Sequence, residues 1–255
     1  MTTTWERALV TGASSGIGRA IARQLAEAGT DLVVVARDTD RLDALSVELP
    51  VEVEVLGADL GDPSAVERVV ERLRDDARPV DILINNAGLG FVGPTLSTPD
   101  EHDELTVAVN VVALHKLCRA AATAMTPRGR GAILNVSSIA GDMPGPQSAT
   151  YNATKAFVTS FSEALHVQLK PHGVTVTALC PGLTRTEFQE RAGVADLVAP
   201  GFVWQSADDV AAAGLAGTAA GKAVVVSGAV NKAATGILRA LPRGVTRGIV
   251  ARVRT

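Results

Sequence analysis

The sequence predicts an α/β fold, in which a doubly wound sheet of seven parallel strands is covered by helices on both faces. Short runs of Val, Ile, Leu and Ala alternate along the chain with longer amphipathic stretches. The short runs are almost continuously apolar, which is typical of strands buried on both faces of a parallel sheet. A glycine-rich turn follows the first run, at a place where such sheets bind ligands.

The composition excludes several classes of protein. Of 255 residues, 47% are hydrophobic and 20% are charged, which excludes a disordered, collagen-like or coiled-coil chain. The net charge of −3 predicts no nucleic-acid partner. The two cysteines, Cys118 and Cys180, form no ligand pattern, so we expect no metal site and no disulfide. Residues 1–7 are polar and show no signal segment. We therefore expect a cytoplasmic protein.

Each expected strand is a short apolar run, and each expected helix has apolar residues at helical spacing. The strands are expected at residues 7–11, 31–36, 51–58, 80–85, 131–137, 174–180 and 222–227. The helices between them are expected at residues 16–28, 39–49, 63–77, 98–126, 149–170 and 206–220. The third helix has the clearest start, because Asp62 is a good N-cap and Pro63 follows it. These elements use up the chain, so residues 1–255 are expected to form one domain.

The turn after the first strand has the pattern TGxxxGxG. Its glycines are Gly12, Gly16 and Gly18, within the segment Thr-Gly-Ala-Ser-Ser-Gly-Ile-Gly at residues 11–18. Glycine lets the backbone approach a phosphate closely, and the following helix offers free N–H groups to the anion. The alternative is an ordinary turn between a strand and a helix. The position of the turn, directly after a strand, favours the phosphate site.

Two residues at the ends of the next strands fit a dinucleotide lying across the sheet. The second strand ends in Ala36, and Arg37 follows where an acidic residue would hold a ribose 2′-hydroxyl. An arginine there can pair with a 2′-phosphate, which favours NADP over NAD. The alternative is a solvated arginine at the start of a loop. Asp59, after the third strand, either accepts a hydrogen bond from the adenine or caps the helix at Pro63.

A tyrosine and a lysine occupy one face of the fifth helix. Tyr151, the only tyrosine, precedes Lys155 by four residues, a spacing that places both on the same helical face. A neighbouring cation favours a phenolate, so we expect the pKa of Tyr151 to be lowered by Lys155 and a bound nicotinamide. Ser138 follows the fifth strand, at the edge where open α/β sheets hold ligands. Its hydroxyl can hydrogen-bond a carbonyl oxygen.

These motifs resemble those of the short-chain dehydrogenase/reductase family. The glycine-rich turn, Asn85-Asn86-Ala87-Gly88, Asn110, Ser138, Tyr151-Asn-Ala-Thr-Lys155 and Pro181-Gly182 occur in the order and spacing of that family, over about residues 5–230. The resemblance implies a Rossmann-like domain and an NADP-dependent oxidoreductase, with NAD as the less favoured coenzyme. The substrate that the resemblance implies is a carbonyl compound or a secondary alcohol. The alternative is a non-catalytic sensor that binds a dinucleotide.

The resemblance also implies roles for individual residues. Tyr151 is the expected acid/base and Ser138 polarises the carbonyl. Lys155 tunes Tyr151 and binds the nicotinamide ribose. Asn110 is expected to hold a water that links Lys155 to solvent. The structural alternative, a buried amide that bonds backbone at a helix kink, is compatible with that role. Further cofactor contacts are expected from Ser14, Ser15, Ile17, Asp59, Leu60, Asn86, Ala87, Gly88, Pro181, Gly182, Thr184 and Thr186, whereas Asn85 is expected only to end its strand.

Two segments lie outside these motifs. Residues 183–205 are long and apolar, and we expect them to form a substrate lid, for a hydrophobic substrate, or a loop that packs on itself. Residues 229–255 carry six basic and no acidic residues, and we expect an amphipathic helix broken near Pro242. We expect this tail to pack on the domain or on a second subunit. The alternative is that it contacts an anionic membrane. We expect a homodimer through helices 98–126 and 149–170, with a tetramer as the alternative.

Overall fold

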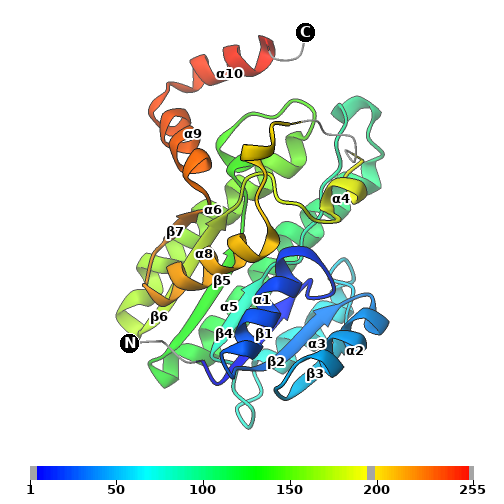
Figure 1. Ribbon diagram of the computed structural model, residues 1–255, viewed down its shortest axis with the longest axis vertical. Coiled ribbons are helices and arrows are strands. Elements are labelled where there is room, and N and C mark those ends of the chain that lie inside the picture. The colour runs from blue at the N-terminus through cyan, green and yellow to red at the C-terminus, as the bar shows by residue number, and fades with distance from the viewer. Residues whose placement is uncertain (1–4, 194–198, 253–255) are drawn as a thin grey trace.

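The computed structural model describes residues 5–193 and 199–252, and only the backbone of residues 243 and 249–252. Seven strands form one parallel sheet, as the sequence predicts, and the structure shows their order to be β3-β2-β1-β4-β5-β6-β7 (Figure 1). The strands are β1 (Arg7–Thr11), β2 (Asp31–Ala36), β3 (Val53–Gly57), β4 (Ile82–Asn85), β5 (Gly131–Val136), β6 (Val174–Cys180) and β7 (Val224–Val226). The strand order reverses between β1 and β4, which is where doubly wound sheets open a crevice for ligands.

Helices cover both faces of this sheet. They are α1 (Gly16–Glu27), α2 (Thr39–Glu48), α3 (Pro63–Leu73), α4 (Asp100–Val107), α5 (Leu114–Met125), α6 (Ala149–Leu169), α7 (Phe188–Arg191), α8 (Ala207–Ala219), α9 (Ala229–Ala240) and α10 (Arg243–Arg252). The helices α9 and α10 extend away from the sheet toward the C-terminus (Figure 1). The break between them falls at residues 241–242, so the expected interruption near Pro242 is confirmed.

Alternate residues of each strand supply two separate cores. Leu9, Val33 and Leu83 face the core that α3, α5 and α6 cover. Their neighbours Val10 and Val34 face the other core, which α1, α2 and α8 cover. Because successive side chains of a strand point to opposite faces, a continuous apolar run fills both cores at once.

The structure corrects several expected boundaries. Residues 98–126 do not form one regular helix, because a π-helical segment, Ala108–Ala113, separates α4 from α5. By length and mean hydropathy the whole run, Asp100–Arg128, is long and apolar enough to cross a membrane, but half of its most apolar stretch is buried inside the protein, as in a core helix. The strands expected at 51–58 and 222–227 are each shorter at both ends, and α3 ends at Leu73 rather than at residue 77.

A matched pair of valines tests the position of the core. Val33 is fully buried in β2, whereas Val47 on α2 is 88% exposed. Val33→Ala should lower the free energy of unfolding by about 2 kcal/mol or more, because it removes buried methyl groups and leaves a cavity. Val47→Ala should change it by less than about 0.5 kcal/mol. Denaturant unfolding of both variants measures the difference, and equal losses would contradict this placement of the sheet.

Candidate active site

The glycine-rich turn lies at the switch point between β1 and β4. Thr11 Oγ1 accepts hydrogen bonds from the backbone N–H groups of Asn86 and Ala87, each at 3.0 Å. Asn86 in turn donates its side-chain amide to the carbonyl oxygens of Thr11 and Gly12. These bonds join the end of β1 to the segment after β4 and hold both at the crevice. Among the cofactor residues expected from the sequence, Asn86 therefore also has a clear structural role.

Close packing explains the glycines in this turn. Gly12 has φ +66°, and a Cβ there would lie 2.7 Å from Nδ2 of Asn86. A Cβ on Gly18 would lie 2.3 Å from the same atom, and one on Gly16 would lie 3.0 Å from the methyl group of Thr186. The side chain of Ser15, the N-cap of α1, makes no capping hydrogen bond within the described residues. The first N–H groups of α1 therefore face a site suited to a phosphate.

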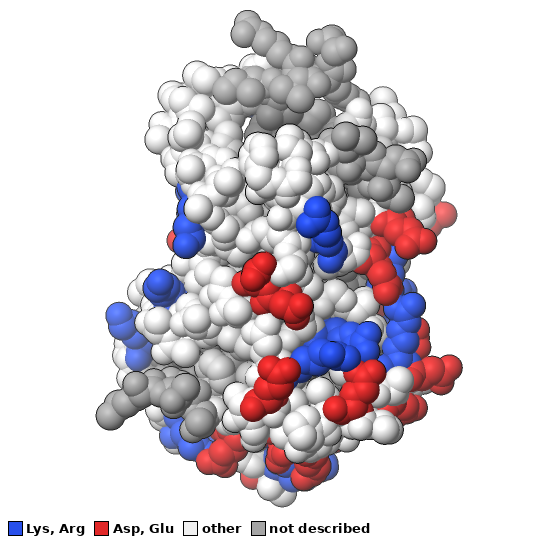
Figure 2. Space-filling model, in the orientation of Figure 1, with Lys and Arg blue, Asp and Glu red and all other residues white. Residues whose placement is uncertain are grey.

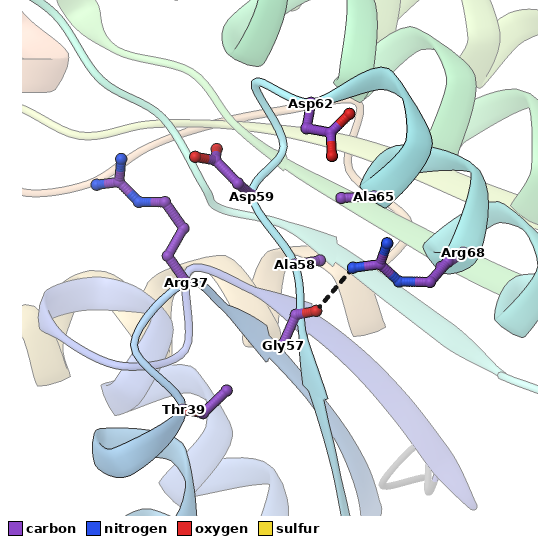
Figure 3. A pocket seen from close by; sticks show the side chains of 8 residues that line it. All are labelled: Arg37, Thr39, Gly57, Ala58, Asp59, Asp62, Ala65 and Arg68. Carbon is purple, nitrogen blue, oxygen red and sulfur yellow. Dashed lines mark hydrogen bonds between the residues drawn. The ribbon is translucent and has the colours of Figure 1, made fainter.

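A pocket of about 380 Å³ lies beyond the ends of β2 and β3. Figure 3 shows Arg37 and Asp59 on its rim, with Arg68 reaching in from α3. Arg68 donates a hydrogen bond to the carbonyl oxygen of Gly57 at 3.1 Å. The other lining residues are Thr39, Ala58, Asp62 and Ala65. Two exposed guanidinium groups thus flank a space at the adenine end of the expected dinucleotide site.

The structure contradicts one of the two alternatives for Asp59, that it caps the helix at Pro63, and leaves the adenine contact a prediction. The N-cap of α3 is Asp62, whose carboxylate accepts from the backbone N–H of Ser64 at 2.9 Å. Asp59 instead accepts from the backbone N–H of Gly61 and faces the pocket. Leu60, also expected at the cofactor, is buried in the core between the sheet and α3, so only its backbone can reach a ligand.

Ser138, Tyr151 and Lys155 come together at the carboxyl edge of the sheet. Lys155 is buried on α6, and its Nζ donates to the carbonyl oxygen of Val136 at 2.9 Å. The same Nζ lies 5.7 Å from the centre of the Tyr151 ring. Ser138 is the N-cap of the short helix η4 (Ile139–Asp142), and its hydroxyl accepts from the backbone N–H of Ala140. The Ser138 side chain also lies close enough to Tyr151 to act on the pKa of its hydroxyl, which completes the cluster.

The segment after β4 packs tightly on this cluster. A Cβ on Gly88 would lie 3.2 Å from Nζ of Lys155, and a Cβ on Gly90 would lie 2.5 Å from the Tyr151 ring. We could not single out Gly90 from the sequence alone. The only signal in the sequence is that Gly90 lies near the Asn-Asn-Ala-Gly motif. A glycine in a loop usually indicates only a turn.

Asn110 lies in the π-helical segment and is buried. Its side-chain oxygen accepts from the backbone N–H of Leu89, and its amide donates to the Leu89 carbonyl at 2.7 Å and to Oγ1 of Thr154. This arrangement matches the alternative of a buried amide that bonds backbone at a helix irregularity. A Cβ on Gly88 would touch both Asn110 and Lys155, so Asn110 also lies beside the lysine.

Burial shifts the pKa values of the tyrosine and the lysine in opposite directions. It raises the pKa of Tyr151 to about 12, although the hydrogen bond with Ser138 acts against this shift. It lowers the pKa of Lys155 to about 8, because an ammonium is costly to desolvate. In the protein alone the pKa of Tyr151 is therefore raised rather than lowered, and our expectation of a lowered pKa, which included a bound nicotinamide, stays a prediction. The ammonium bonds a backbone carbonyl, and the cost of desolvation is larger than its attraction to a phenolate.

The segment after β6 covers the glycine-rich turn and the tyrosine. Pro181 and Thr184 are buried, and Thr184 donates its hydroxyl to the carbonyl oxygen of Gly182. Thr186 contacts the turn, and the ring of Phe188 lies 5.5 Å from that of Tyr151. Part of the expected lid, residues 194–198, lies outside the described residues.

An ion pair that the sequence did not reveal ties this segment to α2. Arg41 donates two hydrogen bonds to the carboxylate of Glu187, at 2.8 and 2.9 Å. Arg191 also pairs with Glu187. Nothing in the sequence distinguishes these residues from other surface charges, because 146 positions separate Arg41 from Glu187.

The comparison with known families decides the family of the chain. Residues 6–195 match the model of the short chain dehydrogenase family. The chain belongs to this family. As a short chain dehydrogenase, it is an oxidoreductase that uses a nicotinamide dinucleotide.

Several known short chain dehydrogenases are similar to this one. Sulfoacetaldehyde reductase 2 of Chromohalobacter salexigens is 40% identical over 184 residues, which are 71% of this chain and 73% of that protein. A short-chain dehydrogenase from Sphingobium yanoikuyae, solved in complex with NADPH, has 38% identity and a TM-score of 0.82 over 93% of this chain and 96% of that one. The bulky-bulky ketone specific alcohol dehydrogenase from Comamonas testosteroni has 32% identity and a TM-score of 0.78, over 94% and 96% of the two chains.

Two glycines with positive φ test the close approach at the turn of this short chain dehydrogenase. Gly12→Ala and Gly29→Ala both place a side chain at a left-handed position, which costs about 1–2 kcal/mol. Only Gly12 has neighbours within 4 Å of the new Cβ, whereas Gly29 has none. Gly12→Ala should therefore lower stability further and weaken coenzyme binding at least about tenfold, and Gly29→Ala should leave binding unchanged. Fluorescence titration with NADPH and NADH measures binding, and equal affinities of the two variants would contradict the role of the turn.

The lowered pKa of Lys155 predicts a pH dependence of coenzyme binding. Its ammonium is charged below about pH 8 and loses its proton as the pH rises through that value. Affinity for the anionic coenzyme should therefore fall between about pH 7 and about pH 9.5. Lys155→Met should bind more weakly at neutral pH and should show no such step. Calorimetric titration across the range measures both profiles, and a flat profile for the unaltered protein would overturn the assignment of this pKa.

Proposed function

We propose that the protein is an NADP(H)-dependent reductase or dehydrogenase that interconverts a carbonyl and a secondary alcohol on a hydrophobic small molecule. The observation that carries the proposal is the meeting of Ser138, Tyr151 and Lys155 beside a phosphate-suited turn at the same edge of the sheet. A non-catalytic sensor would have no need of all three groups, so their presence favours catalysis.

The residues present fit a nicotinamide dinucleotide. The first N–H groups of α1 and the glycines of the turn suit the pyrophosphate, and the pocket beyond β2 and β3 suits the adenosine end. Lys155 and the segment after β4 lie where the nicotinamide ribose would be held. Thr184 and Thr186 on the segment after β6 suit the other side of the coenzyme. When bound, the nicotinamide supplies or accepts the hydride.

The three polar side chains then have separate tasks. In reduction, the substrate oxygen lies between Ser138 and Tyr151. Ser138 donates a hydrogen bond that stabilises the developing negative charge on that oxygen. Tyr151 stays protonated at neutral pH, as its raised pKa requires, and gives its proton to the oxygen. Lys155 places a positive charge beside the phenol, which favours proton release at that moment. The same groups act in reverse in oxidation.

Arg37 supports a preference for NADP over NAD. It is exposed at the end of β2, and it lines the same pocket as Arg68. No carboxylate pairs with Arg37 in the part of the chain that the structure describes. A 2′-phosphate in this pocket would meet two guanidinium groups. The similar short-chain dehydrogenase from Sphingobium yanoikuyae was solved in complex with NADPH, which supports the same coenzyme here.

Apolar side chains around Tyr151 support a hydrophobic substrate. Phe188 packs on the tyrosine ring, and the lid backbone at Ala192 accepts from the backbone N–H of Val92 in the segment after β4. Gly93 donates to the Gln147 carbonyl, which joins that segment to the loop before α6. In Figure 2, the acidic and basic side chains that are coloured lie over the middle and lower part of the face shown. The expected lid residue Phe202 instead points to solvent, and Trp204 packs beside Arg185 within the segment itself.

We also propose a homodimer in the cytoplasm. Val112, Phe157 and Val167, on the helical run 108–125 and on α6, are large apolar side chains that are at least one third exposed, as expected for a face that a second copy covers. The thiols of Cys118 and Cys180 are both free and buried, which suits a reducing compartment. Light scattering in solution tests the assembly, and cell fractionation tests the location.

Arg37→Ala tests the coenzyme preference. A charge-assisted bond to phosphate contributes about 1.5–3 kcal/mol, so the NADPH/NADH ratio of kcat/KM should fall about tenfold to a hundredfold. The loss should come from NADPH alone, because NADH carries no 2′-phosphate. Arg23→Ala, at another exposed arginine, is the control and should keep the ratio of the unaltered enzyme. An unchanged ratio in Arg37→Ala would show that this residue does not read the phosphate.

Tyr151→Phe tests the proton donor. The change removes one oxygen and keeps the ring against Phe188, so folding should survive and NADPH affinity should stay within a few-fold. Turnover should fall about a hundredfold to ten-thousandfold, the usual loss of a general acid. The measurement is NADPH oxidation with a panel of ketones and aldehydes. Near-normal turnover by the variant on the best substrate would place the proton donor elsewhere.

A further inference from the structure

The helix α9 turns polar residues toward the body of the protein. Asn231, Thr235 and Arg239 follow one another at intervals of four, so they share a helical face. Asn231 and Thr235 are 7% and 3% exposed, whereas Ile237 on the same helix is 64% exposed. A surface helix normally buries its apolar face. Here Asn231 and Arg239 make polar contacts with the domain, whereas the buried hydroxyl of Thr235 has no hydrogen-bond partner among the described residues.

The first of these contacts reaches the base of the lid. Asn231 donates its side-chain amide to Oε1 of Gln205 at 2.9 Å, and Ser227 donates to the same oxygen at 2.7 Å. The Gln205 backbone pairs with Leu183 and Arg185 at the other end of the lid. One end of α9 therefore holds the place where both ends of the lid meet.

The second contact reaches the loop that carries Ser138. Nε of Arg239 donates to Oδ1 of Asp142 at 3.0 Å. Asp142 is the last residue of η4, whose N-cap is Ser138. The side chain of Asp142 is only 18% exposed, and its Oδ2 is buried without a partner among the described residues. The Arg239 side chain is 42% exposed, so the pair is partly buried, and loss of Arg239 would leave the enclosed Asp142 carboxylate without its counter-charge. The ion pair therefore favours the observed position of Asp142.

The short helix η4 transmits this contact to the reacting groups. At one end, the Ser138 hydroxyl caps η4. In the middle, a Cβ on Gly141 would lie 2.8 Å from the backbone carbon of Lys155, so η4 rests directly on α6 at the lysine. At the other end, Asp142 is fixed by Arg239. A shift of Asp142 therefore moves an element of four residues that begins at Ser138.

We propose that Arg239 is a positioning residue for the reaction, because through Asp142 it holds the helix that begins at Ser138. The inference rests on the proposed function, in which Ser138 bonds the substrate oxygen. It assigns a task to a C-terminal helix that lies beyond residues 6–195, the part of the chain that matches the family model. Arg239 touches neither substrate nor coenzyme, so its effect should appear in turnover rather than in coenzyme binding.

Three variants of the ion pair and one control test this assignment. Arg239→Ala should lower kcat about tenfold to a hundredfold, since a displacement of about 1 Å far from the chemistry can have an effect of this size. Its dissociation constant for NADPH should stay within about twofold of the unaltered enzyme. Arg239→Lys keeps the positive charge and should recover part of kcat. Lys232→Ala, at an exposed basic residue of the same helix, is the control and should leave kcat unchanged. Asp142→Asn should reproduce the loss if Arg239→Ala fails to fold.

A double-mutant cycle separates positioning from general loosening. If Arg239 acts through Ser138, then adding Arg239→Ala (or Asp142→Asn) to Ser138→Ala should lower the single-turnover rate by less than about twofold more. A further loss as large as that of Arg239→Ala alone would overturn the proposal, and so would an unchanged kcat in Arg239→Ala and Asp142→Asn. Either of these outcomes would leave the proposed function intact as long as Ser138→Ala itself turns over slowly. Full turnover by Ser138→Ala would instead contradict both the proposed function and the positioning role of Arg239.

Discussion

The parallel register of the central strands is the constraint on which the rest of the structure depends. It brings the carboxyl ends of β1, β4, β5 and β6 to one edge, where the chain places its glycine-rich turn, Asn86, Ser138 and Pro181. Thr11 fixes the segment after β4 against the end of β1, because its hydroxyl accepts hydrogen bonds from two consecutive backbone N–H groups of that segment. The crevice at the switch point is therefore built by hydrogen bonds across the two strands rather than by loop shape alone.

A buried polar network extends this constraint to the helices. Asn85 and Asn135 are register partners on β4 and β5, and the amide of Asn85 donates to Oδ1 of Asn135 at 2.9 Å. Asn135 then donates to Ser162 of α6, and Cys118 of α5 contacts both asparagines. Buried polar groups need partners, so this network fixes how α5 and α6 sit on the sheet. We had expected Asn85 only to end its strand, and these contacts show that it does more.

The need of buried polar groups for hydrogen-bond partners also explains the position of Lys155. Its ammonium is buried, and the Val136 carbonyl at the end of β5 satisfies it. Its own backbone carbonyl accepts from Ser137 and Thr159, so the turn of α6 that carries it is tied to β5. A lysine held in this way keeps its place but gives up part of its affinity for a proton. The lowered pKa of Lys155 and its fixed geometry are therefore consequences of one arrangement.

Much of this could be predicted from the sequence, because the signals were local. Continuous apolar runs identified every strand, and Asp62 with Pro63 marked the start of α3. A helix kink at Asn110 was one of our alternatives, but its π-helical form and the hydrogen bonds of Asn110 to Leu89, which lies 21 residues away, could not be predicted. The contacts of Arg41 with Glu187 and of Arg239 with Asp142 are more distant still. Surface charges of this kind carry no local signal, and only the folded chain shows which of them meet.

The transfer of a hydride is the central claim, and isotope transfer tests it most directly. The purified protein is incubated with NADPH that carries deuterium at C4 of the nicotinamide and with a panel of ketones and aldehydes. The account predicts that the alcohol product of at least one substrate contains one deuterium on the former carbonyl carbon, and that Tyr151→Phe forms this product far more slowly. Tight binding of NADPH without any labelled alcohol across the panel would contradict it.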